Sequence, residues 1–276
     1  MTINLIDHAF AHLHVDSGRY SSVHGKISKH IKYVRNQRDF DGVTIFTDGC
    51  IHPQTISQVK STHKIAWLIE NRYVNPHAYN IIPHCIDQLD YVLTHDSQLL
   101  EQYPDKCRRV PFGGGWINEE NFGISKKTKL ASIIYSNKKG PHEGYSMRHK
   151  IAEKYGDKID LFGNGSPNPI DNKEDALEDY MFSIVIENIN DKNYFTEKLI
   201  DPLLVGTIPV YWGCSNINEF IDERGIIRFD MDSFDDVLET LNEETYNNML
   251  KYAKINLEKA KAYEITEDWI YENVFE

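Results

Sequence analysis

The chain has 276 residues, of which 41% are hydrophobic and 26% are charged, and its formal net charge is −12. This length suits one large domain or two smaller ones, and the apolar content is enough for a packed core, which excludes a wholly disordered protein. The negative charge opposes binding to nucleic acid or to an anionic membrane, although a few placed cations can still hold a small phosphorylated ligand.

The sequence contains no signal peptide and no apolar run long enough for a membrane span. Its four cysteines are far apart and form no C-x-x-C pair, which suits buried thiols in a reducing compartment. We therefore expect an untargeted, soluble, cytoplasmic protein.

Short runs rich in Val, Ile, Tyr and Phe alternate with segments of helical spacing along the whole chain. This alternation predicts βαβ units and largely parallel sheets, that is, the α/β class. In the first half we expect strands at residues 4–6, 43–46, 65–69, 91–94 and 109–111, and helical segments at 25–35, 53–60, 77–88 and 97–102.

Three consecutive glycines, residues 113–115, follow the last of these strands and make a poor interior for a strand or a helix. They predict a linker between two lobes, residues 1–116 and 117–276. In the second lobe we expect strands at 130–135, 159–162, 182–186, 208–211 and 226–229, and helices at 145–155, 173–180, 196–205, 217–221 and 234–241. After Glu243 apolar positions recur with a period of 3.6 residues and predict a long closing helix.

The most informative stretch is residues 182–213, FSIVIENINDKNYFTEKLIDPLLVGTIPVYWG. A hydrophobic strand leads into Glu187 and Asn188, and after a polar loop Thr196 is placed to cap a helix. In an open α/β sheet, ligands bind outside the carboxyl ends of the strands, and a helix N-terminus favours an anion.

Three side chains near the start of this helix strengthen its interpretation as an anion-binding site. Lys198 supplies a full positive charge, Tyr194 a hydroxyl, and Glu197 a carboxylate suited to two sugar hydroxyls. The alternative is a capped helix with a solvated Glu–Lys pair.

The order F-x-x-x-x-E-N, Y-x-T-E-K and G-x-x-P-V-x-x-G in this stretch resembles the family-10 glycosyltransferases, the α1,3/4-fucosyltransferases. Weaker similarity lies outside it. The helix that carries Arg148 and the turn at residues 160–165 resemble parts of the same family, and Glu70-Asn71 resembles its acidic loop on the acceptor side.

The resemblance implies a GT-B fold of two Rossmann-like lobes with a GDP-sugar in the cleft between them. It also implies that Arg148 and Lys198 neutralise the diphosphate, Tyr194 contacts it, Glu197 holds the ribose, Asn188 shapes the pocket and Glu70 is the general base. The implied donor-binding set is Arg148, Glu187, Asn188, Tyr194, Thr196, Glu197 and Lys198.

The implied activity is an inverting transfer of fucose from GDP-fucose to a hydroxyl of a glycan acceptor, with no metal or other cofactor. Cations aimed at a leaving diphosphate stabilise the transition state more than the ground state, and a carboxylate on the opposite face can take the acceptor's proton. The absence of a membrane anchor suggests a cytoplasmic bacterial or viral protein. For Arg148 the alternative is a helix-surface charge, and for Glu70 it is a surface ion pair beside Arg72.

Two other classes of function stay open. Asp230 and Asp232 have the D-x-D form of a metal-dependent GT-A transferase, although Ser233 and Asp236 have the spacing of a helix N-cap with an acidic first turn. A two-lobed binding protein without turnover would also fit the pattern.

Two further groups of residues are weaker candidates. His8, His12 and His14 are close enough in sequence to suggest a metal site, but no carboxylate or cysteine nearby evidently converges with them. Trp67 and Trp116 are candidates for stacking on a sugar, although aromatic residues in such places more often belong to the core.

Overall fold

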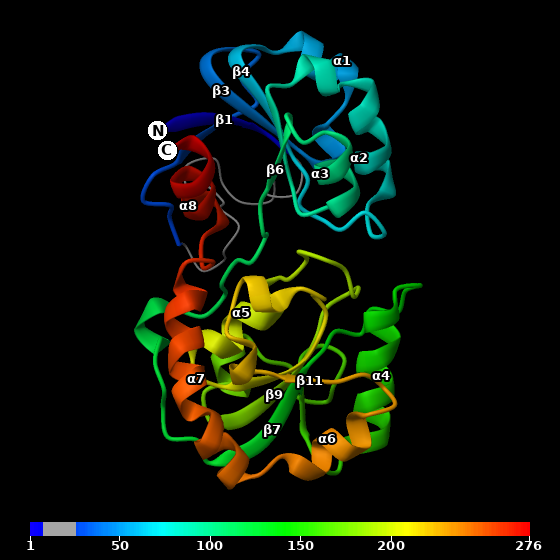
Figure 1. The fold of residues 1–276 in the computed structure, drawn as a ribbon, viewed down its shortest axis with the longest axis vertical. Helices are drawn as coiled ribbons and strands as arrows, with labels where there is room; N and C mark the ends of the chain where they lie inside the picture. The colour runs from blue at the N-terminus through cyan, green and yellow to red at the C-terminus, as the bar shows by residue number, and fades with distance from the viewer. Residues whose placement is uncertain (8–25) are drawn as a thin grey trace. The chain divides into compact units, whose positions relative to one another are not determined.

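The computed structural model describes residues 1–7 and 26–276, so His8, His12 and His14 lie outside the described residues. The chain forms two compact units (Figure 1). Unit 1 comprises Met1–Phe112, Lys192–Tyr194 and Ile265–Glu276, and unit 2 comprises Gly113–Asp191 and Phe195–Glu264.

The division falls just before the glycine run. The sequence-based division assigned residues 265–276 to the second lobe, whereas here they belong to unit 1, because Ile265 and Ile270 are buried in its core. No helix among the described residues is long and apolar enough to cross a membrane.

Unit 1 is built on a six-stranded parallel sheet in the order β2-β1-β3-β4-β5-β6. Helices cover it because the inner strands β1, β3, β4 and β5 bury apolar side chains on both faces. The strands are β1 (Thr2–Ile6), β2 (Lys32–Arg35), β3 (Asp39–Thr47), β4 (Lys60–Trp67), β5 (Tyr91–Thr94) and β6 (Cys107–Arg109), and the α-helices are α1 (Pro53–Gln58), α2 (Pro76–Ile81), α3 (Ser97–Gln102) and α8 (Thr266–Ile270).

The helix predicted at residues 25–35 is wrong. In its place β2 pairs in parallel with β1, and Ile31 and Tyr33 are buried while Lys32 between them is exposed. This alternation of period two is typical of a strand, but it is too short to stand out against the helical spacing of the longer segment. Residues 77–88 form a short α2 followed by the 3₁₀ turns Ile82–His84 and Ile86–Gln88.

Unit 2 contains a five-stranded parallel sheet in the order β11-β10-β9-β7-β8. Its strands are β7 (Lys129–Ile134), β8 (Asp160–Phe162), β9 (Tyr180–Ile186), β10 (Ile208–Trp212) and β11 (Ile227–Arg228). Its α-helices are α4 (Glu143–Tyr155), α5 (Glu197–Leu204), α6 (Phe234–Thr240) and the expected long helix α7 (Glu243–Lys261).

Two predicted helices of unit 2 are 3₁₀ turns instead. The segment 173–180 contains the turn η6 (Lys173–Ala176) and then enters β9, because Tyr180 is buried and belongs to the sheet. The segment 217–221 contains the turn Ile217–Glu219.

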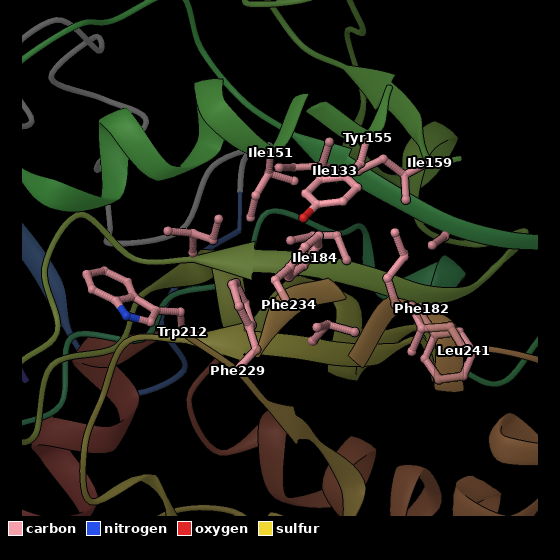
Figure 2. Packing of buried hydrophobic residues seen from close by; sticks show 14 of the residues in the cluster. Ile133, Ile151, Tyr155, Ile159, Phe182, Ile184, Trp212, Phe229, Phe234 and Leu241 are labelled. Atoms are coloured by element: carbon pink, nitrogen blue, oxygen red, sulfur yellow. The ribbon is translucent and has the colours of Figure 1, made fainter. Parts of the chain in front are cut away.

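The core of unit 2 lies on both faces of its sheet, as the alternation along β9 shows. Phe182 and Ile184 pack with Ile151 of α4 and Phe234 of α6 (Figure 2). Val185 points to the other face and packs with the residues of α5. The sheet is therefore held rigidly from both sides, and so are the residues at its strand ends.

Each sheet has a position where the direction of strand addition reverses. In unit 2 this switch point lies between β7 and β9, and in unit 1 between β1 and β3. Ligands of open α/β sheets bind outside the carboxyl ends of the strands at such a point. These ends carry Glu187 and Asn188 after β9 and Asp48 after β3.

Candidate functional site

Glu187 joins the end of β9 to the start of α5. Its side chain is fully buried, and its two carboxylate oxygens accept hydrogen bonds from the backbone N–H and the hydroxyl of Thr196, each at 2.8 Å. Thr196 is the N-cap residue of α5, and its hydroxyl also accepts from the backbone N–H of Lys198 at 3.3 Å. The helix N-terminus is thereby fixed at the carboxyl edge of the sheet, where it favours an anion.

Lys198 lies between two carboxylates in the first turn of α5. Its Nζ is 3.1 Å from Oε1 of Glu197 and 3.9 Å from Oε2 of Glu187. Burial alone would lower the pKa of Lys198, but these two carboxylates raise it. The side chains of Glu197 and Lys198 are only 13% and 28% exposed, so the interpretation as a solvated surface pair is wrong.

Arg148 on α4 is buried rather than displayed on the helix surface. Its guanidinium donates two hydrogen bonds to the carbonyl oxygen of Ile186 and one, at 3.0 Å, to Oδ1 of Asn188. Arg148 therefore fixes the last residue of β9 and the loop after it, and it brings a positive charge close enough to Lys198 to oppose that residue's protonation.

The close packing around these residues depends on two glycines. A Cβ added to Gly144, in the first turn of α4, would lie 1.8 Å from the carbonyl oxygen of Glu187. A Cβ at Gly213, the last glycine of the G-x-x-P-V-x-x-G motif, would lie 2.6 Å from Cγ of Glu187. Both positions exclude any side chain, and this explains one of the motif's glycines in physical terms.

Sequence reasoning missed a second ion pair behind Glu197. Nζ of Lys173, on η6, is 2.6 Å from Oδ2 of buried Asp201 and 3.7 Å from Oε1 of Glu197. The ammonium also lies 4.2 Å from the ring centre of Trp116, whose backbone N–H donates to Asp201 at 2.7 Å. No local sequence pattern predicts this cluster, because its members come from three separate segments of the chain.

The electrostatic result for Glu197 is a strongly acidic carboxyl. Burial by itself would raise its pKa, but the charges of Lys198 and Lys173 outweigh burial and lower the pKa to about 2. Glu197 is therefore fully ionised at neutral pH and acts as a hydrogen-bond acceptor only.

The candidate base, Glu70, belongs to unit 1 and follows β4. Its side chain is exposed, while its backbone carbonyl accepts a hydrogen bond from the hydroxyl of Tyr79 at 2.5 Å. The neighbouring Arg72 makes a bidentate pair with Asp96, with both N···O distances at 2.7 Å.

Tyr194 also clusters with unit 1, unlike the other members of the predicted donor-binding set. It is buried, and its ring centre lies 5.0 Å from that of His95. The side-chain amide of Asn193 donates to the backbone carbonyl of His95 at 3.1 Å. Trp67 is buried in the core of unit 1, whereas Trp116 in unit 2 is 37% exposed.

The D-x-D segment forms a local turn. One oxygen of Asp230 accepts hydrogen bonds from the backbone of Asp232 and from the backbone and hydroxyl of Ser233. Ser233 precedes α6 as expected, but its hydroxyl makes no bond to the helix backbone. Among the described residues, no three His, Cys, Asp or Glu side chains are grouped so that they could hold a metal ion.

Comparison with known proteins decides the family. The model of glycosyltransferase family 10 (fucosyltransferase), C-terminal part, matches residues 124–269, which is more than half of the chain. The chain belongs to this family. The expected resemblance is thus confirmed, and the matched region contains every residue of unit 2 that the sequence assigned to the donor site.

Two curated relatives illustrate the distance within the family. The chain is 26% identical over 174 residues to an α-(1,3)-fucosyltransferase, FucT, of Helicobacter pylori, covering 59% of this chain and 34% of the relative. It is 30% identical over 217 residues to a putative fucosyltransferase, R654, of Acanthamoeba polyphaga mimivirus, covering 66% of this chain and 35% of the relative. The chain therefore spans about a third of the length of the curated relatives that it matches.

A solved α1,3-fucosyltransferase with GDP-fucose has a similar fold. The TM-score is 0.57 at 17% identity, and the match covers 99% of this chain and 90% of that one. The expected GT-B fold, with two Rossmann-like lobes, is confirmed. Because a GT-A transferase has a different fold, the interpretation of Asp230 and Asp232 as a GT-A site is wrong.

Proposed function

We propose that this family-10 chain transfers fucose from GDP-fucose to a hydroxyl of a glycan acceptor, with inversion at the transferred carbon. The observation that carries the proposal is the buried array at the N-terminus of α5, in which Lys198 lies between Glu187 and Glu197 at the switch point of the sheet. Sites of this form bind phosphate groups through a helix N-terminus and a fixed cation.

The donor half of the reaction uses unit 2. Lys198, Arg148 and the N-terminus of α5 supply positive charge for the diphosphate, which gains negative charge as its bond to the sugar breaks. Because these groups are held by buried partners before the ligand arrives, they need no reorganisation in the transition state. Ionised Glu197 has the acceptor capacity to bind two ribose hydroxyls.

The acceptor half of the reaction uses Glu70. The oxygen of the acceptor hydroxyl forms a bond to the anomeric carbon of fucose, and the bond from that carbon to the β-phosphate oxygen breaks. GDP leaves with the bonding electrons, and the hydroxyl proton goes to the Glu70 carboxylate. The products are the fucoside and GDP, and the carboxyl must lose its proton before the next turnover.

The relatives support the donor and the reaction class. The Helicobacter protein is named an α-(1,3)-fucosyltransferase, and one of the solved fold neighbours was determined with GDP-fucose. These properties belong to those proteins, and we extend them to this chain on the basis of the shared motif residues.

The first test is thermal unfolding with GDP, UDP and CMP, each with and without EDTA, followed by assay of GDP release from GDP-fucose with glycan acceptors. A ligand at about 100 times its Kd stabilises the folded state by roughly 2.7 kcal/mol. We expect GDP alone to raise Tm, with no effect of EDTA, and an acceptor to accelerate GDP release. A GDP-dependent shift without acceptor-dependent release would instead indicate a binding protein.

The Lys198→Met variant tests the site assignment. It removes the cation proposed for the diphosphate, and we expect kcat/KM for GDP-fucose to fall by roughly 100-fold or more. The matched control is Lys154→Met, which removes a lysine from an exposed ion pair with Asp235 in the same unit. If Lys198→Met keeps the activity of this control, the donor site is not at α5.

A further inference from the structure

The loop that carries Glu70 lies next to a buried carboxyl in unit 1. Asp48 is the first residue after β3, and the register pairs Thr47, the last residue of β3, with Trp67, the last residue of β4. The chain after β4 therefore runs past Asp48, whose strand borders the switch point between β1 and β3. Asp48 is only 7% exposed.

The peptide groups on both sides of Glu70 are held by buried side chains. One carboxylate oxygen of Asp48 accepts from the backbone N–H of Ile69 at 2.9 Å, and the other receives a longer contact, 3.4 Å, from the N–H of Glu70. On the other side, the hydroxyl of Tyr79 donates to the carbonyl oxygen of Glu70 at 2.5 Å. The Glu70 side chain is exposed, yet its Cα is fixed from both directions.

Asp48 occupies a conformation that an L residue seldom adopts. Its φ is +33°, in the left-handed region, where a glycine would fit without strain. Residues held in such conformations cluster at active sites and ligand clamps, where the surrounding structure fixes them. Here the side chain of Asp48 is the one that binds the loop of Glu70.

The charge of Asp48 also acts on Glu70. Burial raises the pKa of Asp48 to about 6, against the two backbone donors that lower it, and the charge of Glu70 adds to the rise. Among the described residues, the charge of Asp48 also acts on Tyr79 of α2 and on Cys50 of the same turn. Burial is the largest cause that raises the pKa of each, and at Cys50 the charge of Asp7 adds to that of Asp48. Above pH 6 the charges of Asp48 and Glu70 repel each other, since like charges disfavour a second ionisation.

We propose that Asp48 and Tyr79 are positioning residues for the transfer reaction: they fix the backbone of Glu70, and the negative charge of Asp48 acts on its carboxylate. This inference rests on the proposed function, in which Glu70 accepts the acceptor's proton. It adds to that function a second carboxyl that touches neither substrate and acts only through Glu70.

The experiment measures kcat, KM for GDP-fucose and the pH profile of kcat/KM for Asp48→Asn, Tyr79→Phe and Glu70→Gln. For Asp48→Asn we expect kcat to fall roughly tenfold with little change in KM for GDP-fucose. We also expect the acid limb of the pH profile, the range in which kcat/KM falls as the pH is lowered, to move to lower pH by roughly half a unit to one unit. For Tyr79→Phe we expect a smaller fall in kcat and an acid limb at its original pH, because the charge beside Glu70 is kept.

The matched control is Glu174→Gln in unit 2. Glu174 is also a buried carboxyl that holds a loop through a backbone N–H, that of Asn118 at 2.8 Å. We expect this variant to lose stability without a shift of the acid limb. If Asp48→Asn behaves like Glu174→Gln, the inference is overturned. If Asp48→Asn does not fold, a wild-type kcat for Tyr79→Phe overturns it.

The Glu70→Gln variant distinguishes a failure of the proposed function from a failure of this inference alone. If it transfers fucose at the wild-type rate, both the base assignment and this inference fail. If it is inactive while Asp48→Asn and Tyr79→Phe retain wild-type kcat and pH profile, only the inference fails.

Discussion

The two sheets hold the acidic groups at their carboxyl ends in opposite ways. In unit 2, Glu187 and Glu197 are buried, and both lie beside Lys198. In unit 1, the side chain of Glu70 is exposed, and the buried side chains of Asp48 and Tyr79 bind its peptide group. Under the proposed function, the network for the charged donor is thus formed in advance, whereas the proposed base is an exposed side chain on a fixed backbone.

This contrast predicts different consequences for substitutions in the two units. A substitution in unit 2 breaks an ion network and should weaken donor binding. A substitution of Glu70 by glutamine keeps the two hydrogen bonds of its peptide group, so we expect it to affect the transfer step more than the fold.

The largest effect is expected for Glu70→Gln. Loss of a general base typically lowers the rate by about 10²–10⁴-fold, and glutamine keeps the size and the backbone contacts of Glu70. We expect kcat for transfer to fall by that amount while the Tm shift produced by GDP stays unchanged. The control is Glu101→Gln, an exposed glutamate on α3 of the same unit. A loss of the GDP shift together with kcat would break the division of tasks between the two units.

The next effect is that Glu197 in unit 2 and Asp48 in unit 1 contribute to the pH dependence of stability with opposite sign. Glu197 has its pKa lowered to about 2, so its contribution to stability is complete above about pH 4.5 and is lost as the pH falls towards 2. Asp48 has its pKa raised from 3.8 to about 6, so it binds a proton in the folded state first, and stability falls as the pH rises from about 4 to about 6.

Hydrogen exchange, corrected for its intrinsic pH dependence, can follow the two units separately through peptides from β4 and β9. Over its pH range, each carboxyl should change the free energy of unfolding by no more than about 3.5 kcal/mol, since one pKa unit corresponds to about 1.4 kcal/mol. Glu197→Gln should flatten the slope in unit 2 alone, and Asp48→Asn that in unit 1 alone, so each variant is the control for the other. The comparison is contradicted if the two variants change the pH dependence of stability in the same direction.

Sequence patterns located the elements that have strong local signals. The predicted strand at 91–94 and helix at 97–102 coincide with β5 and α3, since Asp96 caps that helix through its own side chain. The helix predicted at 25–35 failed because only four of its residues form β2, and a four-residue strand is defined by its partner β1 rather than by its own composition.

The same distinction applies to the site. Glu187, Thr196 and Lys198 could be grouped from the sequence, because a strand end, a loop and a helix cap place them together within one short segment. Asp48 could not be linked to Glu70, because their contact depends on the register between β3 and β4. Lys173 likewise reaches Glu197 only through tertiary packing, which no spacing in the sequence encodes.

The smallest effect expected is that of Lys173→Met, and it tests whether the ion network of unit 2 extends beyond the family motif. This change removes one of the two cations that lower the pKa of Glu197 and leaves Asp201 buried without its ion-pair partner. We expect KM for GDP-fucose to rise roughly tenfold, about 1.4 kcal/mol, with kcat little changed, and Lys173→Arg to restore part of the loss. Lys129→Met, which removes an exposed pair with Asp179 in the same unit, is the control.

A double variant separates binding from stability in that experiment. Adding Asp201→Asn to Lys173→Met removes the uncompensated buried charge, so thermal stability should recover in part, because an orphaned ion costs more than the loss of the whole pair. KM for GDP-fucose should stay raised, since Glu197 still lacks its second cation. If KM recovers together with stability, Lys173 supports the fold alone, and the preformed donor network ends at Lys198.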